Sequence, residues 1–89
     1  MLDIAIHKTF TKDVKKAKLN PTNSAKLFMY ISLLLNGEEL PSQSKDHDLT
    51  GTYQDTREFH ISGDLLVVYR IEENTLELLR LGTHSQLFK

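Results

Sequence analysis

Apolar residues in the first part of the chain follow a strand-like spacing and then a helical one. Residues 2–6 alternate large apolar side chains with smaller or acidic ones, which predicts a short strand with one apolar face. Thr9 can cap a following helix, in which Phe10, Val14 and Ala17 fall on one side at helical intervals. We therefore expect the chain to begin with a strand and an amphipathic helix.

A second, longer helix is predicted between Asn20-Pro21 and Gly37. Proline interrupts the preceding helix and favours a new helix start, and glycine can adopt the left-handed conformation that ends a helix. The apolar positions between these signals form one stripe, which consists of Leu27, Phe28, Ile31, Leu34 and Leu35. We expect the two helices to form a hairpin whose stripe covers a sheet.

The second half of the chain has the spacing of strands. Residues 38–52 are polar and contain a proline and a glycine, so a loop is predicted there. Three strands are predicted at 53–61, 65–71 and 75–81, separated by short polar turns, and 84–89 are expected to form a short tail. Strands joined by tight turns pair as antiparallel hairpins.

The order strand, helix, helix and three strands predicts an α+β fold with both helices on one face of a small antiparallel sheet. The chain has 89 residues, and no repeat or linker-like stretch divides it. A chain of this length builds one hydrophobic core, so residues 1–89 are expected to be a single domain.

Composition excludes several classes of protein. The absence of cysteine rules out disulfide frameworks, thiol catalysis and cysteine-based zinc sites. The longest apolar run, at 65–69, is far shorter than the ~20 residues of a membrane span. The first ten residues lack the basic and apolar regions of a signal peptide. We therefore expect a soluble cytoplasmic protein without membrane contact.

The net charge of −1 conceals a division of charge along the chain. Residues 1–30 hold six lysines and two aspartates, a net charge of +4, whereas 31–89 hold five basic and ten acidic residues, a net charge of −5. The predicted first helix carries Lys12, Lys15 and Lys16 opposite its apolar side. A basic helical face on an acidic body is compatible with a nucleic-acid partner or with an ordinary solvated surface.

Three histidines lie at predicted strand ends or in adjoining loops, where a scaffold can present side chains to a ligand. These are His47, His60 and His84, and Asp64 follows His60 by four residues. Imidazole gains and loses a proton near neutral pH, as general acid–base catalysis requires. The carboxylate of Asp64 can orient an imidazole or act as a base.

Arginine completes a set of groups suited to cleaving RNA without a metal ion. Arg57 and Arg80 are permanent cations that can bind a phosphate through two hydrogen bonds. A base can deprotonate the ribose 2′-OH, the oxygen can attack phosphorus, and an acid can protonate the leaving 5′-oxygen. Arg70 is more simply a cross-strand partner of a neighbouring glutamate, and we assign it no functional role.

Three spaced segments of the chain resemble a known toxin family. The run KDHDLTGTYQDTREFHISGDLLVVYRI, followed by LRLGTHSQLF, is similar to the signature of the YafQ branch of the RelE/ParE toxin superfamily. FTKDVKK also resembles the first helix of that family. The resemblance covers essentially the whole chain and implies a RelE-like fold.

The resemblance implies the toxin of a type II toxin–antitoxin pair, an endoribonuclease that cuts mRNA in the ribosomal A site. It implies a protein antitoxin as a partner, ribosomal RNA as a contact of Lys12, Lys15 and Lys16, and no cofactor. Glu58 and Arg57 match a pair beside the active site, and Leu65 stands where relatives often have tryptophan. The family's functional residues correspond to His47, His60, Asp64, Arg80, His84 and Phe88.

The resemblance leaves the individual roles open. We expect His84 to be the general acid and Asp64, together with His60, to be the general base, although the opposite assignment fits equally well. His47 and Arg80 would then hold the phosphate, and Phe88 would stack on a base or order the tail.

Two alternatives belong to other classes of function. The first is a ParE-like toxin that binds a partner such as DNA gyrase without cutting RNA. The second is a metal site formed by His47, His60, His84 and Asp64, since histidine and carboxylate can ligate zinc. No short histidine spacing supports such a site, so no metal is expected.

Overall fold

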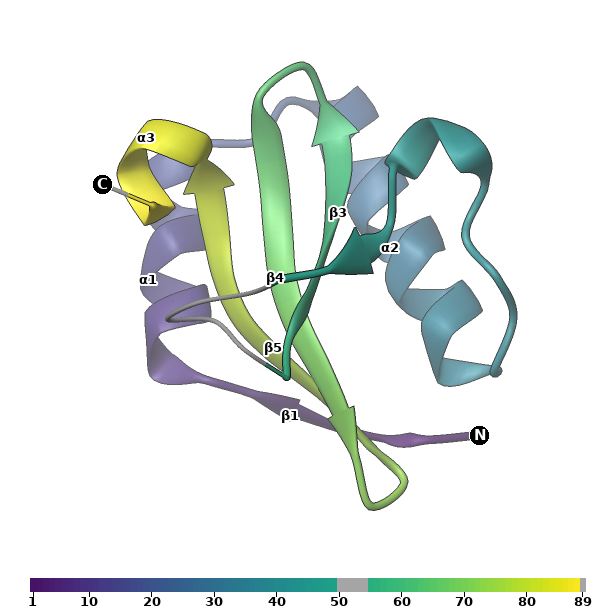
Figure 1. Ribbon diagram of the computed structural model, residues 1–89. Coiled ribbons are helices and arrows are strands. Elements are labelled where there is room, and N and C mark those ends of the chain that lie inside the picture. The colour runs from purple at the N-terminus through teal and green to yellow at the C-terminus, as the bar shows by residue number, and fades with distance from the viewer. Residues whose placement is uncertain (50–54, 89) are drawn as a thin grey trace.

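The computed structural model describes residues 1–49 and 55–88, which form an α+β structure with a mixed five-stranded sheet (Figure 1). The strands are β1 (Asp3–Ile6), β2 (His47–Asp48), β3 (Arg57–Ser62), β4 (Leu65–Glu72) and β5 (Thr75–Thr83). The helices are α1 (Lys8–Ala17), α2 (Pro21–Leu35), the 3₁₀ turn η1 (Ser42–Ser44) and α3 (His84–Leu87). The predicted fold class and the order of its main elements are confirmed.

The sheet has the strand order β1-β5-β4-β3-β2. The hairpins β3–β4 and β4–β5 are antiparallel, as predicted, but β1 pairs with β5 in parallel. Two strands joined by a tight turn pair in antiparallel fashion. No such turn joins β1 to β5, which are far apart in the sequence, so these two strands can pair in parallel. The sheet is therefore mixed and not wholly antiparallel.

Both long helices cover the same face of the sheet and enclose the larger hydrophobic core (Figure 1). On β3 and β4, alternate residues face this core because side chains of a strand point to opposite faces in turn. Burying these side chains supplies the main stabilisation of the fold. The buried members are Phe10, Leu27, Tyr30, Leu34, Phe59, Ile61, Val67, Tyr69, Leu76, Leu78 and Leu81.

The ends of α2 follow the predicted chemistry. The side chain of Asn20 accepts a hydrogen bond from the backbone N–H of Asn23 at 2.8 Å, and Pro21 occupies the first turn. Gly37 ends the helix with a φ of +72°, where its N–H donates to the backbone oxygen of Leu34. Among the described residues, no helix is both long enough and apolar enough to cross a membrane.

The start of α1 differs from the prediction. The helix begins at Lys8 with His7 in the capping position, and His7 makes no side-chain capping hydrogen bond. Thr9, the predicted cap, lies inside the first turn. The backbone leaves β1 directly into the helix, so the pairing of β1 with β5 determines where α1 begins.

A bulge in β5 breaks the predicted alternation of that strand. Val68 pairs with Arg80, but the next residue, Tyr69, pairs with Leu78, so Leu79 is an extra residue. Leu78 and Leu81 both reach the larger core although three positions separate them. The strict alternation that the sequence predicts is therefore wrong beyond Leu78.

Several predicted boundaries also change. Within the predicted loop, η1 and the short strand β2 form, and the remainder of that loop, 50–52, lies outside the described residues. The strand predicted at 53–61 begins at Arg57, and 53–54 lie outside the described residues. The predicted tail forms α3, and β5 extends to Thr83. Pairing with β3 stabilises β2, and the cap of Thr83 stabilises α3. Neither segment contains a long periodic run of apolar residues from which it could have been predicted.

Arg70 and Glu77 form the cross-strand pair that the sequence predicts. The Arg70 Nε and Nη2 atoms donate to the two Glu77 carboxylate oxygens at 2.9 and 3.0 Å, and His7 Nε2 lies 3.1 Å from Glu77 Oε1. These contacts, that of Arg70 first, lower the pKa of Glu77 to about 2. The pair links β4 to β5, and the contact of Glu77 with His7 extends this link to the residue between β1 and α1.

The substitution Glu77→Gln tests this link. We expect it to lower the free energy of unfolding at pH 7 by about 0.5 to 1 kcal/mol, because the charge-assisted bonds are lost. Because the pKa of Glu77 is lowered in the folded state, the wild-type advantage is complete above the ordinary pKa of 4.5 and vanishes as pH falls through about 2.

Urea denaturation of both proteins at neutral and acidic pH measures the difference. The exposed Glu39→Gln is the matched control and should leave stability nearly unchanged. A difference between wild type and Glu77→Gln that does not shrink in acid would show that the charge of Glu77 is not its cause.

Candidate functional site

The candidate site lies on the face of the sheet opposite α1 and α2. On β3, Phe59 and Ile61 point into the larger core, so Glu58 and His60 project to the other face. A second, smaller apolar cluster supports this face. Its members are Leu49, Leu66, Val68, Leu79, Leu87 and Phe88.

A capping box at the end of β5 positions His84. The Thr83 side chain accepts from the Gln86 backbone N–H at 3.3 Å, and the Thr83 N–H donates to Gln86 Oε1 at 2.9 Å. Gly82 permits this arrangement, because a Cβ atom there would lie 2.8 Å from Gln86 Oε1. The Gly82-Thr83-His84 sequence therefore turns the strand into α3 and presents His84 at the first helical position.

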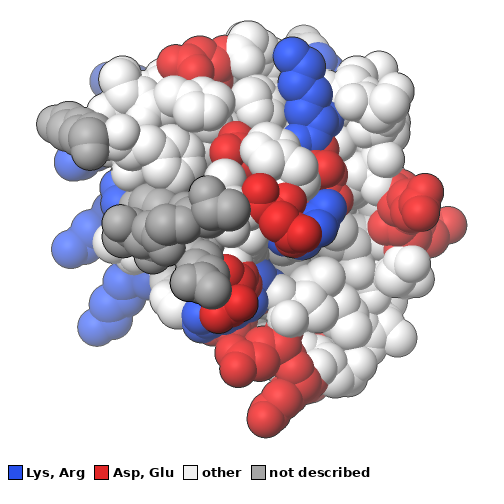
Figure 2. Space-filling view, viewed as in Figure 1, with Lys and Arg blue, Asp and Glu red and all other residues white. Residues whose placement is uncertain are grey.

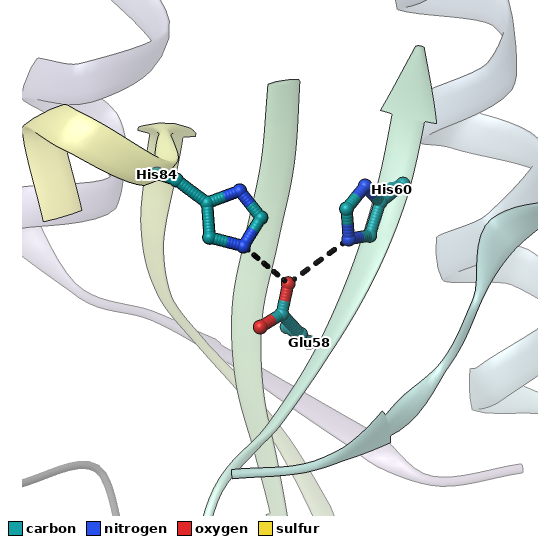
Figure 3. Close-up of side chains that lie close together, drawn as sticks. All are labelled: Glu58, His60 and His84. Atoms are coloured by element: carbon teal, nitrogen blue, oxygen red, sulfur yellow. Dashed lines mark ion pairs between the residues drawn. The ribbon is translucent and has the colours of Figure 1, made fainter. Parts of the chain in front are cut away.

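The carboxylate of Glu58 is the point on which the histidines converge (Figure 3). Its Oε2 atom lies 3.1 Å from His60 Nε2 and 3.7 Å from His84 Nε2. Its Oε1 atom lies 3.4 Å from Nε2 of His47, which pairs with Glu58 across the sheet. The Glu58 side chain is 3% exposed, whereas His84 is 49% exposed, so a buried carboxylate lies beneath accessible imidazoles.

Each of the three imidazoles is anchored through its other nitrogen. A backbone carbonyl or an ionised carboxylate only accepts hydrogen bonds, so each Nδ1 atom must carry the hydrogen. The acceptors are the Lys45 backbone oxygen for His47 (2.6 Å), the Gly63 backbone oxygen for His60 (3.4 Å) and Asp64 Oδ1 for His84 (2.8 Å). The Nε2 atoms are therefore the nitrogens available for chemistry.

This anchoring has a consequence for Glu58. In a neutral ring with its hydrogen on Nδ1, Nε2 presents a lone pair and cannot donate to the carboxylate. Oε2 of Glu58 is buried and has no hydrogen-bond partner among the described residues. A buried carboxylate without a donor is unfavourable, so a proton or another cation between Glu58 and the rings stabilises the cluster.

Asp64 and His84 form an exposed pair at the rim. The hydrogen bond from His84 is the largest contribution to a lowered pKa of Asp64. The carboxylate therefore stays ionised and holds the Nδ1 hydrogen of His84 at neutral pH. Of the two roles expected for Asp64, orientation of an imidazole is the one that its contact supports.

Arg57 lies on the other face of β3, apart from the histidines. Its Nε atom donates to Asp46 Oδ1 at 3.2 Å and to the Tyr69 hydroxyl at 3.3 Å, and Nη1 donates to Asp48 Oδ1 at 2.7 Å. Burial by itself would lower the pKa of Arg57, but the bonds to Tyr69 and Asp46 raise it. Arg57 thus ties both neighbours of His47 to the sheet.

The hydroxyl of Tyr69 completes this arrangement. It donates to Asp46 Oδ1 at 2.6 Å, and burial, together with the nearby Asp46, raises its pKa. The phenol is therefore neutral and remains a donor at neutral pH. Together these contacts fix the segment that carries His47.

Arg80 is bound to α1. Its Nε and Nη2 atoms donate to the two oxygens of Asp13 at 2.8 and 3.3 Å, and Asp13 Oδ2 also accepts from the Leu81 N–H at 3.0 Å. Burial by itself would raise the pKa of Asp13, but these donors lower it. In the sheet register Arg80 lies opposite Val68, which in turn lies opposite Glu58. Arg80 therefore shares a cross-strand row with the cluster.

Phe88 packs directly against the site. Its ring centroid lies 5.6 Å from that of His84, and its backbone N–H donates to the His84 oxygen at 2.8 Å. The side chain is half-buried in the smaller apolar cluster. Phe88, the residue that follows α3, therefore lies against one side of the His84 ring.

The lysines of α1 form a separate surface. Lys12, Lys15 and Lys16 are exposed, and in Figure 2 many basic groups project from the left side of the molecule, where α1 lies in Figure 1. Acidic groups lie over the centre, the right and the bottom of the same view. Basic groups also lie at the top and centre of this view beside acidic ones, so the left side is a basic part of a mixed surface.

The residues that best fit a metal ion differ from the set expected from the sequence. One donor atom each from Glu58, His60 and His84 lies within 4.8 Å of the others. Asp64 binds the far side of the His84 ring, so Glu58 is the carboxylate at the centre. The sequence signal for Glu58 is its spacing, because a residue two before His60 on a strand shares its face.

Comparisons with known proteins identify similar chains. Residues 2–89 match a family described as "Bacterial toxin of type II toxin-antitoxin system, YafQ". The mRNA interferase toxin YafQ of Escherichia coli K12 is 34% identical over 87 residues, which are 97% of this chain and 95% of that protein.

Solved structures agree in fold. A copper-bound mutant toxin from Helicobacter pylori has 41% identity and a TM-score of 0.92, over 99% of this chain and 100% of that one. The E. coli DinJ–YafQ complex contains a chain with 33% identity and a TM-score of 0.87, with full coverage of both chains.

The contact between Asp64 and His84 predicts how Asp64 titrates. We expect its pKa to lie below the ordinary 3.8, because protonation of the carboxyl removes the acceptor of the His84 N–H. The contact is then complete above pH 3.8 and is lost as pH falls through the lower folded-state value. In His84→Ala the pKa of Asp64 should rise toward its ordinary value, because the side-chain hydrogen bond is lost, and NMR of the side-chain carboxyl carbons measures the change.

The carboxyl of Asp13 serves as an internal control, because it is bound by Arg80 and not by His84. It should titrate identically in wild type and in His84→Ala. An unchanged titration of Asp64 in the variant would contradict the pairing.

Proposed function

The chain belongs to the YafQ family of bacterial type II toxins, and we propose that it is an endoribonuclease that cleaves mRNA in the ribosomal A site. The E. coli relative that it matches over nearly its full length is named an mRNA interferase. The observation that carries the proposal is the convergence of His60 and His84 on buried Glu58, with Asp64 holding His84. This arrangement supplies two ring nitrogens that can exchange protons at an accessible surface.

The proposed reaction is an attack by the ribose 2′-oxygen on the adjacent phosphorus. His60 Nε2 accepts the 2′-OH proton as the new oxygen–phosphorus bond forms. His84, protonated at Nε2, donates that proton to the departing 5′-oxygen, which leaves a 2′,3′-cyclic phosphate and a 5′-OH. Asp64 keeps the Nδ1 hydrogen of His84 in place, so the other nitrogen faces the substrate.

Positive groups around the cluster stabilise the charge that develops on phosphorus. We assign this role to His47 and Arg80, because His47 contacts Glu58 and Arg80 shares its cross-strand row. Phe88, against His84, offers a ring on which a base can stack. Arg57 is assigned to support of the His47 segment and not to phosphate contact, because its bonds join both neighbours of His47.

The reaction as written uses the lone pairs of the ring nitrogens, so it requires no metal ion. The H. pylori relative was crystallised with copper, and in this chain Glu58, His60 and His84 are the residues that fit an ion. An ion bound there would supply positive charge, and it would also occupy the Nε2 atoms of His60 and His84 that the reaction as written uses. In the proposed reaction, the side chains of His60 and His84 transfer the protons.

The lysines of α1 are proposed to contact ribosomal RNA. They lie on a surface apart from the histidine cluster, and a net charge of −1 gives the chain little general attraction to free RNA. The ribosome would therefore hold and position the message. This activity would take place in the cytoplasm, with residues 1–89 acting as one toxin domain.

A cognate antitoxin is the proposed protein partner. The E. coli relative forms a complex with DinJ, and its chain and this one match over their full lengths. We propose that a small antitoxin protein likewise binds this chain and thereby neutralises it.

The substitution His84→Ala tests the nuclease proposal. We expect it to abolish growth inhibition on induced expression and to slow mRNA cleavage about 10²- to 10⁴-fold, because the leaving oxygen loses its acid. Primer extension on translated mRNA detects the cut ends, and circular dichroism checks that the fold is retained.

The control for His84→Ala is His7→Ala, because His7 contacts Glu77 at the opposite end of β5 and should be dispensable for cleavage. Retained cleavage by His84→Ala would remove His84 from the mechanism. Growth inhibition by the wild type without any cut mRNA would instead favour a toxin that acts by binding.

The basic surface is tested by replacing Lys12, Lys15 and Lys16 with glutamine. We expect the slope of log affinity for ribosomes against log salt concentration to become shallower by about 2 to 3, because fewer counterions are released. Filtration binding at several salt concentrations measures the slope. Lys45→Gln, an exposed lysine outside α1, should change it less, and equal changes would argue against a special role of α1.

A further inference from the structure

A pocket of about 260 Å³ lies between α1, the end of β5 and α3. Strand β1 pairs with β5 only from Thr75 to Leu78, so among the described residues no strand covers this edge of β5 beyond Leu78. Pockets for drug-sized molecules have volumes of about 300 to 1,000 Å³. This pocket therefore suits a smaller group, such as a single nucleobase.

The walls of the pocket combine apolar surface with hydrogen-bond donors. Ala17 of α1 and Leu87 of α3 supply apolar surface for the flat faces of a ring. Lys16, which is exposed, contributes an ammonium group. The side-chain oxygen of Gln86 accepts from the Thr83 N–H at 2.9 Å, so the NH₂ group of Gln86 is the part that can donate to a ligand.

The carboxylate in the pocket is already engaged by the protein. Asp13 Oδ2 accepts from Arg80 Nε at 2.8 Å and from the Leu81 N–H at 3.0 Å, and Asp13 Oδ1 accepts from Arg80 Nη2 at 3.3 Å. A ligand that fits the pocket therefore presents acceptors to the donors of Lys16 and Gln86. Guanine presents two neighbouring acceptors, O6 and N7, whereas cytosine presents an amino donor.

The place of the pocket relates it to one side of the proposed cut. In the proposed reaction, His60 on β3 accepts the 2′-OH proton and His84, directly after β5, protonates the leaving 5′-oxygen. The RNA would therefore run 5′ to 3′ from β3 toward β5, and the pocket lies at the far edge of β5. Arg80 lines the pocket and lies two strands from Glu58, a distance of about 10 Å. The nucleotide that carries the leaving oxygen is the one within reach of the pocket.

We propose that this pocket binds the base on the 3′ side of the cut and that it favours guanine. Gln86 lies on α3 together with His84, so a base bound by Gln86 is held in a fixed relation to the proposed general acid. The assignment to the 3′ side rests on the proposed function, because it uses the direction of the RNA. The preference for guanine rests on the pocket alone.

Base binding is tested first on the purified chain, without ribosomes or mRNA. Guanosine 5′-monophosphate and cytidine 5′-monophosphate are titrated separately into ¹⁵N-labelled protein, and NMR follows the backbone and side-chain N–H signals. We expect the guanine nucleotide to shift the Gln86 NH₂ and Ala17 N–H signals and to bind at least about fivefold more tightly than the cytosine nucleotide. Equal affinities, or shifts confined to other parts of the chain, would overturn the pocket.

The preference during cleavage is measured on ribosomes programmed with mRNAs that differ only in the nucleotide after the mapped cut. We expect the wild type to cut before guanine about 5- to 100-fold faster than before cytosine. The substitution Lys16→Met should lower this ratio at least threefold, because one of the two donors is lost.

The matched control is Lys15→Met, because Lys15 is an exposed lysine of α1 that does not line the pocket. Both variants lose one positive charge, and a change in affinity for the ribosome cancels in the ratio of the two rates. Lys15→Met should therefore keep the wild-type ratio. An unchanged ratio in Lys16→Met, or discrimination only of the base on the 5′ side, would overturn the proposal.

A second variant, Gln86→Glu, should reverse the preference. Glutamate keeps an oxygen that can accept from the Thr83 N–H, so the capping box beside His84 is retained. It replaces the NH₂ donor with an acceptor, and a carboxylate accepts from the amino group of cytosine. Cleavage by Gln86→Glu that still favours guanine as strongly as the wild type does would contradict the assignment of Gln86.

The pocket and the nuclease function fail in different ways. If the chain cleaves mRNA without base preference and the guanine nucleotide leaves the pocket signals unchanged, the pocket is overturned and the nuclease function stands. If the chain never cleaves mRNA but the guanine nucleotide shifts those signals, the nuclease function and the 3′ assignment are overturned. Guanine binding in the pocket is then still supported.

Discussion

A buried carboxylate must be matched by donors or cations, and Glu58 imposes this constraint on the whole second face of the sheet. Three imidazoles approach it, each with Nε2 toward the carboxylate and Nδ1 bound to an acceptor elsewhere. Those acceptors belong to two parts of the chain: Lys45 precedes β2, and Gly63 and Asp64 form the β3–β4 turn. The cluster therefore joins the turns around the site as well as providing its chemistry.

One face of the sheet carries the larger core, and the other face carries the candidate site. On β3, Phe59 and Ile61 enter the core beneath α1 and α2, and the residues alternating with them carry the ionisable groups. The strand is held rigidly by its apolar side, so the polar side is presented with little freedom. Among the described residues a small apolar cluster supports that second face, and His84 is half-exposed at the rim.

Ion pairs outside the cluster connect the other elements to this frame. The pair of Arg80 and Asp13 joins the basic helix α1 to β5, so it links the proposed RNA-contacting surface to the cross-strand row that contains Glu58. Arg57 binds the aspartates on both sides of His47 and holds the short strand β2 at the edge of the sheet. Asp13 thus lies on the basic helix and Arg57 lies among acidic residues, so these ion pairs join oppositely charged parts of the chain.

The sequence by itself determined the long elements. Helix α2 has an apolar stripe and a signal at each end, and the short turns between β3, β4 and β5 require antiparallel hairpins. Residue type and local spacing identified His60 and His84 as candidates, and the structure places both rings beside Glu58. The parallel pairing of β1, the bulge at Leu79 and the short helix α3 depend on contacts between distant segments. The central position of Glu58 has the same origin, because only the folded sheet brings residues from β2, β3 and α3 around one carboxylate.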